Sequence, residues 1–145
     1  MFSNRLIIGE IGFEKWQLET PFTFNSITGL TVTVDDGFIC DLASVPGIAQ
    51  SLVSKMGYWT QPAVLHDWLY HRHRNGLDKV VTRLQADNMF IEGCRIKAAE
   101  YDVPLLERRE WLLYGGVRAG GWGSWATPEE TKEMQEKDLL PDYFN

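Results

Sequence analysis

The stretch AVLHDWLYHRHRN, residues 63–75, places a histidine and an aspartate side by side among apolar residues. Three apolar residues precede His66 and Asp67, and Trp, Leu and Tyr follow them. A charged group among apolar neighbours is costly unless a partner or a ligand compensates it. The stretch therefore predicts a helix whose polar pair meets a partner elsewhere in the chain or binds a ligand.

Helix signals lie on both sides of this stretch. Thr60 is a predicted N-cap, and Pro62 suits the first turn of the helix that follows. The sequence NGLD predicts a turn in which Asp78 caps the next helix. We therefore expect an antiparallel hairpin of helices, over about 60–74 and 79–99, at the core of the fold.

Two more helices are predicted, one before the hairpin and one after it. Ser44 is a predicted N-cap with Pro46 in the first turn, and Pro104 opens a helix whose apolar pattern includes Trp111. That last helix is expected to dissolve into the glycine-rich sequence GGVRAGGWGSW. In the hairpin, the second helix should bury a stripe made of Val80, Val81, Leu84, Ile91 and Cys94.

The residues before the helices alternate as strands do. KWQLE and LTVTV (30–34) alternate apolar and polar side chains, and GFIC follows the turn residues DDG. These runs predict a small antiparallel sheet over about 14–41. With three to four helices over about 44–121, the fold class is α+β. We expect a single domain over 1–125, followed by a charged C-terminal tail at 126–145.

Composition and charge argue against several classes of protein. The 145 residues suit one domain, and 44% hydrophobic residues are enough for a packed core. The net charge of −6 argues against a general nucleic-acid binder. The sequence contains no run of about 18 apolar residues, so it predicts no membrane span. Its N-terminal residues are also unlike a signal peptide. Cys40 and Cys94 lack metal-ligand spacing, so we expect a protein made in the reducing cytoplasm.

A basic patch is the one feature that would modify this conclusion on nucleic acid. Five of the six Lys and Arg residues between positions 72 and 97 of this acidic chain could form such a patch. We expect them to form an ordinary solvated surface, because most runs of charge do. These residues are Arg72, Arg74, Arg83, Arg95 and Lys97.

The hairpin predicts a partner for His66. His66 lies about ten residues before the middle of the turn and Asp87 about ten residues after it, so two regular antiparallel helices bring them to the same level. The carboxylate of Asp87 would then hold one imidazole nitrogen and leave the other free to take a proton from water. Tyr70, four residues after His66, lies on the same face and could steady Asp87. A plain polar contact in the core explains the same spacing.

Asp67 is a candidate ligand for a cation. It points about 100° away from His66 around the helix, which leaves it free to bind something else. A carboxylate beside a general base suits a hard cation such as calcium. Asp41 and nearby backbone carbonyls, in the segment CDLASVPG at 40–47, are the expected further ligands.

Three motifs together resemble a family found in bacteriophages and prophages, domain of unknown function 1353. They are DGFICDLASVPG, AVLHDWLY and ADNMFIEG, in that order, and the resemblance covers roughly residues 14–121. Cys40 stands where the family usually has threonine. The resemblance implies a phage or prophage source, with other phage structural proteins as partners and the virion as the destination after synthesis in the host cytoplasm.

The sequence HDWLY followed by ADNMF also resembles the helical core of the phospholipase A2 superfamily over about thirty residues. That resemblance implies that His66 activates water, Asp87 orients it, Asp67 binds calcium and Tyr70 braces the dyad. The substrate would be a lipid or another component of the host envelope. The Gly-rich calcium loop of that superfamily has no counterpart in 42–59, which contains single glycines and no GxG.

Two functional hypotheses follow. The first is a phage virion- or tail-associated protein with a phospholipase A2-like or hydrolase-like site, used on the host envelope during infection. The second is a catalytically inactive structural or assembly protein of the particle, in which the His66–Asp87 pair is only a core contact.

Overall fold

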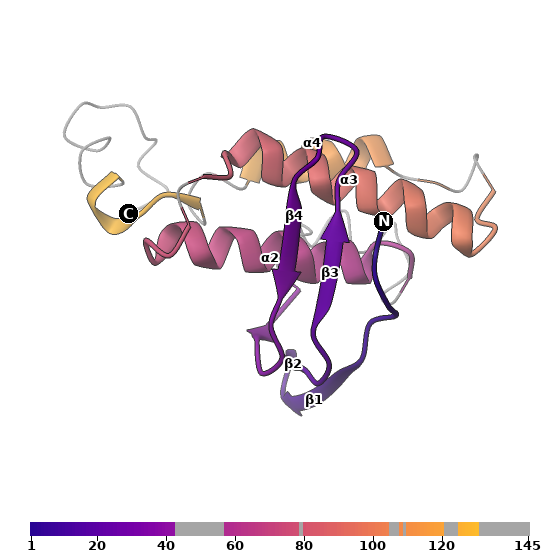
Figure 1. Ribbon diagram of the computed structural model, residues 1–145, viewed down its shortest axis with the longest axis horizontal. Coiled ribbons are helices and arrows are strands. Elements are labelled where there is room, and N and C mark those ends of the chain that lie inside the picture. Colours follow the sequence, from indigo (N-terminus) through magenta and orange to yellow (C-terminus); the bar gives the residue numbers. More distant parts are fainter. Residues whose placement is uncertain (43–56, 79, 105–107, 109, 121–124, 131–145) are drawn as a thin grey trace.

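The computed structural model describes residues 1–42, 57–78, 80–104, 108, 110–120 and 125–130 (Figure 1). Strands precede helices along the chain, as the α+β fold class requires. The helix expected after Ser44 and Pro46 lies outside the described residues. The elements are β1 (Ile8–Gly12), β2 (Lys15–Leu18), β3 (Phe22–Asn25), β4 (Thr31–Val34), β5 (Ile39–Cys40), α2 (Thr60–Arg74), α3 (Arg83–Glu100) and α4 (Glu110–Gly120).

The strands form two antiparallel sheets rather than the single sheet expected over 14–41. One sheet has the order β1-β2-β5, and the other pairs β3 with β4. β2, β4 and β5 match the predicted strands, whereas β1 and β3 were not predicted. β1 has the sequence IGEIG, which lacks alternation, and its residues are half-buried or exposed. Its pairing with β2 therefore comes from the sheet partner and not from its own pattern.

The β3–β4 hairpin runs across α2 in Figure 1 and is fastened to α3 through its turn. Glu92 of α3 accepts hydrogen bonds from the Ser26 hydroxyl at 2.7 Å and from the Ile27 N–H at 2.8 Å. The rings of Phe22 and Phe24 pack against Phe2 on the inner side. These contacts join the N-terminal strands to the helices in one core.

α2 begins close to the predicted position but with a different cap. Trp59 occupies the N-cap without a side-chain hydrogen bond, so the prediction of Thr60 as N-cap was wrong. Thr60 is the first helical residue, and its hydroxyl accepts a hydrogen bond from the Gly57 N–H at 3.0 Å. The same hydroxyl that suggested a cap therefore closes the turn before the helix.

α3 begins four residues later than predicted. Thr82 is its N-cap and forms a capping box with Gln85, whereas Asp78 accepts a hydrogen bond from the Val80 N–H within the preceding turn. Val80 is 80% exposed and Leu84 is 50% exposed, so two members of the predicted stripe were wrong. The others, Val81, Ile91 and Cys94, are buried.

A glycine lies where α2 and α3 approach each other. A Cβ on Gly93 would lie 3.0 Å from Pro62 Cγ of α2 and 3.1 Å from the Phe2 ring. Small residues of both helices, among them Ala63 and Ala86, are also fully buried. The helices can therefore pack closely along the part of the hairpin that carries His66.

α4 differs from the predicted fourth helix at both ends. It runs from Glu110 to Gly120, so the glycine-rich sequence is helical through Gly120 and the expected end before it was wrong. Leu113 and Val117, four residues apart, are fully buried, whereas Trp111 is 73% exposed and not part of the core. Burial of this pair outweighs the roughly 1 kcal/mol that each glycine costs inside a helix. Positions 105–107 and 109 lie outside the described residues.

The start of the predicted tail belongs to the packed structure. Trp125 and Ala126 are buried, and Trp125 stacks on His73 of α2 with 4.0 Å between ring centroids. Thr127 and Glu130 exchange hydrogen bonds at the start of a further helical turn. The predicted boundary at 125 therefore falls inside a packed segment, and positions 131–145 lie outside the described residues.

Candidate functional site

The hydrogen bond predicted between His66 and Asp87 is present. His66 Nε2 lies 2.6 Å from Asp87 Oδ1, and the Tyr70 hydroxyl donates to the same oxygen at 2.6 Å. The capping box at Thr82 starts α3 with Asp87 facing α2. The helix hairpin thus brings the three candidate catalytic residues together from two elements.

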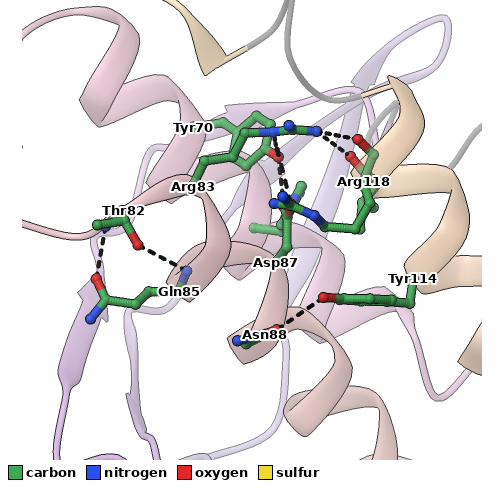
Figure 2. A network of polar contacts seen from close by, with 10 residues as sticks. Tyr70, Thr82, Arg83, Gln85, Asp87, Asn88, Tyr114 and Arg118 are labelled. Atoms are coloured by element: carbon green, nitrogen blue, oxygen red, sulfur yellow. Dashed lines mark hydrogen bonds and ion pairs between the residues drawn. The ribbon is translucent and has the colours of Figure 1, made fainter.

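The second oxygen of Asp87 is held from α4 (Figure 2). Arg118 Nη1 donates to Asp87 Oδ2 at 2.7 Å, and Arg83 Nε lies 3.8 Å from the same oxygen. Arg83 also donates to the Tyr70 hydroxyl at 3.3 Å. Sequence reasoning missed both arginines: Arg83 had been assigned to a solvated surface, and Arg118 lies 31 residues from Asp87 with no local pattern to connect them.

These contacts keep Asp87 ionised although it is fully buried. Burial alone would raise the pKa of the Asp87 carboxyl, but hydrogen bonds from His66, Tyr70 and Arg118 outweigh burial and lower it. The Tyr70 hydroxyl has a raised pKa, first because of its burial and then because it donates to Asp87. The network therefore combines a carboxylate with a neutral phenol.

His66 is neutral in this network. Burial lowers its pKa, and the hydrogen bond and charge of Asp87 oppose that effect only in part. Because Nε2 faces a carboxylate, it carries the ring proton, which leaves a lone pair on Nδ1. The Nδ1 atom is buried, and no hydrogen-bond partner for it lies among the described residues. This arrangement can accept a proton at Nδ1 without moving the ring.

Aromatic rings fix the orientation of the imidazole. The His66 ring lies 4.1 Å from the Tyr70 ring and 5.3 Å from the Phe90 ring, measured between centroids. Trp125 packs edge-on against Tyr70 at 4.9 Å. His66 is 1% exposed as a result. The dyad therefore lies in a packed interior instead of on an open surface.

The second pair of candidate residues, Asp67 and Asp41, also lies close together. The pKa of Asp67 is raised well above its usual value, first by burial and then by the negative charge of Asp41, against a hydrogen bond from the Leu42 backbone N–H. Both aspartates, after burial, also raise the pKa of the Cys40 thiol, to about 12. Asp67 Oδ2 is buried, and within the part of the chain that the structure describes it has no hydrogen-bond partner.

The aspartate pair meets part of what calcium requires. Calcium takes six to eight oxygen ligands, mostly carboxylates and carbonyls. Asp67 offers an unpartnered buried oxygen, and the charge of Asp41 adds to the attraction for a cation. Within the described residues, no group of three His, Cys, Asp or Glu side chains could hold a metal ion. Backbone carbonyls or water would have to supply the remaining ligands.

Comparison with known proteins identifies the family. The family model described as "Protein of unknown function (DUF1353)" matches residues 16–117, about 70% of the chain, which includes both helices of the hairpin and most of α4. Searches of curated proteins and of solved structures found no match. Within the described residues, no helix is long and apolar enough to cross a membrane. The chain therefore belongs to the DUF1353 family, and the resemblance to phospholipase A2 is not supported by any of these comparisons.

Proposed function

We propose that this member of the DUF1353 family is a bacteriophage virion- or tail-associated protein with a hydrolase-like His–Asp site. The observation that carries the proposal is the unpaired Nδ1 atom of His66, since Asp87 holds the other ring nitrogen at 2.6 Å. A neutral imidazole fixed by a carboxylate is the arrangement that general-base catalysis uses. A purely structural histidine would be expected to satisfy both nitrogens.

The proposed reaction is hydrolysis of an ester or amide of the host envelope, such as a phospholipid ester. His66 Nδ1 takes a proton from water as the water oxygen attacks the carbonyl carbon, and the same proton then passes to the leaving group. Asp87 stabilises the imidazolium that forms in between, and Tyr70 holds Asp87 in place. The lowered pKa of His66 keeps the ring unprotonated near neutral pH.

Calcium is a proposed cofactor of this site. Asp67 and Asp41 would hold the ion, and when bound it would supply positive charge for the developing oxyanion of the substrate. The raised pKa of Asp67 and its unpartnered Oδ2 support this assignment. A bound cation would lower that pKa and give Oδ2 a partner.

The assignment to a phage particle rests on the three motifs of this chain, which resemble a family found in phages and prophages. The proposed partners are other structural proteins of the particle, with a lipid or another envelope component as substrate. Mass spectrometry of purified particles from a phage that encodes this chain tests the assignment. Detection of the chain at a constant copy number supports a virion component, and its absence from the particles contradicts it.

The full burial of the dyad favours a second candidate function, a catalytically inactive structural or assembly protein. His66 is 1% exposed and Asp87 is 0% exposed, so the pair resembles a satisfied contact between two packed helices. In that case Arg118 and Tyr70 serve only to compensate the buried carboxylate.

An assay of lipid hydrolysis together with thermal melting separates the two functions. The hydrolase proposal predicts that the wild type releases fatty acid from phospholipid vesicles. His66→Gln, which keeps a donor toward Asp87 but has no base, should lose at least about 100-fold in kcat with a near-normal melting temperature.

The structural candidate predicts a different pair of results. The wild type shows no hydrolysis of lipid or amide substrates, and His66→Ala lowers the melting temperature by more than about 10 °C because it removes one donor to the buried Asp87 carboxylate and leaves a cavity in the core. That combination ends the hydrolase proposal.

A further inference from the structure

Arg118 connects the buried dyad to the protein surface. Its Nη1 donates to Asp87 Oδ2 at 2.7 Å, while about a third of the side chain, 34%, is exposed. Within the described part of the chain, its Nε and Nη2 atoms have no hydrogen-bond partner. A guanidinium has five N–H donors in a planar fork, so the outer edge of Arg118 keeps donors that the protein does not use.

The position of Arg118 is fixed by the fold. Arg83 of α3 donates from Nη2 to the backbone carbonyls of Val117 at 3.0 Å and of Arg118 at 2.6 Å, as Figure 2 shows. Val117 packs in the core one residue before Arg118. Arg83 therefore holds the backbone at the end of α4 against α3, and the contact with Asp87 holds the Arg118 guanidinium itself.

The two oxygens of Asp87 hold the imidazole and the guanidinium side by side. His66 uses Oδ1 and Arg118 uses Oδ2 of the same carboxylate. His66 Nδ1, the nitrogen proposed to activate water, faces away from Asp87, so the carboxylate and the imidazole ring separate it from a group bound on the outer edge of Arg118. The chain has a net charge of −6, so a fixed cation at this point matters for any anion that approaches.

We propose that Arg118 binds the anionic group of the substrate, and that the substrate is an ester that also carries a phosphate. This inference rests on the proposed hydrolase function and narrows its substrate class. A forked guanidinium matches two oxygens of a phosphate, and this match distinguishes phosphate-bearing esters from neutral ones of the same acyl chain.

The outer face of α4 fits such a substrate. Trp111 and Gly115 precede Arg118 by seven and three positions, which places all three on one side of the helix. Trp111 is 73% exposed, and no atom lies within 4 Å of where a Gly115 Cβ would be. An exposed indole two turns from a fixed guanidinium suits a molecule with an apolar chain and an anionic group.

A pair of soluble esters tests the inference: dibutyryl phosphatidylglycerol, which carries a phosphate, and tributyrin, which does not. Arg118→Gln should lower the ratio of kcat/KM for the phosphate-bearing ester over the neutral one at least 10-fold. Arg118→Lys, which retains the charge without the fork, should lower the ratio less. Inorganic phosphate should inhibit the wild type competitively, and its inhibition constant should rise at least 10-fold in Arg118→Gln.

Arg5→Gln is the matched control, because Arg5 is an exposed arginine outside the site and the change removes the same charge. It should leave the ratio unchanged. An equal loss for both esters in Arg118→Gln overturns the inference and assigns Arg118 to the support of Asp87 alone. An active wild type whose ratio is the same in Arg118→Gln overturns it while the proposed function stands.

Calorimetry provides a readout that does not depend on turnover. Dibutyryl phosphatidylglycerol and inorganic phosphate are titrated separately into the wild type, Arg118→Gln and Arg5→Gln. Binding of the lipid that weakens at least 10-fold only in Arg118→Gln supports the inference, even if the wild type is inactive and the proposed hydrolase function fails. Binding of phosphate without the lipid restricts the site to a free anion and contradicts an ester substrate, and equal affinities in all three proteins overturn the anion site itself.

Discussion

The surroundings of Asp87 on α3 and of Asp67 on α2 shift the pKa of the two carboxyls in opposite directions. Asp87 accepts from a histidine, a tyrosine and an arginine, and its pKa is lowered. The pKa of Asp67 is raised, first by burial and then by the nearby carboxylate of Asp41, and one backbone N–H opposes this only in part. Burial raises the pKa of both carboxyls, and the difference shows that the donors around Asp87 are numerous enough to outweigh it, whereas the single donor to Asp67 is not.

The comparison assigns different roles to the two carboxyls. Asp87 is a fixed charge that organises its neighbours on three helices, whereas Asp67 retains an unsatisfied oxygen and is thus suited to bind a proton or a cation. Four measurements test this difference between the two carboxyls.

The largest effect is expected for Asp87→Ala. The substitution removes the acceptor of His66, Tyr70 and Arg118 together and should destabilise the fold by about 3–5 kcal/mol, the range for breaking a buried ion pair. Urea unfolding measures this loss. The exposed turn residue Asp36 provides the control, since Asp36→Ala should stay within about 0.5 kcal/mol of the wild type. A loss below about 1 kcal/mol for Asp87→Ala would show that the network is not needed for folding.

A smaller effect is expected for Tyr70→Phe, which removes one of the donors to Asp87 and keeps the ring. A hydrogen bond to a charged group contributes about 1.5–3 kcal/mol, and we expect a loss within that range. The double variant with Asp87→Ala should lose less than the sum of the two single variants, because both changes remove the same contact. Strict additivity in urea unfolding would contradict the contact.

The lowered pKa of Asp87 makes part of the stability depend on pH. Its folded pKa lies below the unfolded value of about 3.9, so its contribution is present above that value and is lost as the pH falls through the folded pKa. The difference in unfolding free energy between the wild type and Asp87→Asn should therefore be constant from pH 5 to 7. Below about pH 4 it should shrink by at most about 1.4 kcal/mol per pH unit. If the difference in unfolding free energy grew on acidification, the pKa of Asp87 would be raised in the folded state and not lowered.

The smallest effect, and one of opposite sign, is expected for Asp67→Asn. The amide keeps an acceptor for the Leu42 N–H and removes the repulsion from Asp41, so without calcium we expect a gain of about 1 kcal/mol at pH 7. Millimolar calcium should raise the melting temperature of the wild type and leave that of Asp67→Asn unchanged. Asp36→Asn is the exposed control. If calcium did not change the melting temperature of the wild type, the proposal that Asp67 and Asp41 bind calcium would be contradicted.

The sequence was informative where the structure depends on regular spacing. The offsets of His66 and Asp87 from the turn predicted their contact, because two regular helices preserve the level of each residue. The same spacing placed Tyr70 on the shared face. These three positions needed only the helical period and the position of one turn.

The sequence was less informative where side chains compete for local roles. Asp78 and Thr82 are both good caps, and the partner Gln85 decided in favour of Thr82. The glycines of α4 indicate a loop, but the buried pair of Leu113 and Val117 holds that segment as a helix. Such choices depend on tertiary contacts that a local pattern does not contain.

Arg118 was out of reach for a related reason. Its contact with Asp87 requires the packing of α4 on α3. Arg83 stabilises that packing by donating hydrogen bonds to two backbone carbonyls of α4. A side chain that donates to backbone atoms of another helix leaves no periodic signal in the sequence. The prediction that the basic residues form a solvated surface was therefore wrong for Arg83. This side chain is only partly exposed and donates hydrogen bonds to Tyr70 and to the Val117 carbonyl.

Gly93 makes the helix hairpin unusually intolerant of sequence change at one position. A single methyl group there would meet Pro62 and Phe2 at 3.0–3.1 Å, so even alanine requires these neighbours on α2 and the N-terminal segment to shift by a few tenths of an ångström. In a library that samples every amino acid at every position, position 93 should favour glycine, tolerate alanine less well and reject large side chains. Gly115, which faces open space, should accept most small and polar residues. The absence of a side chain at position 93 thus limits how much the sequence can change there while the helix hairpin is kept.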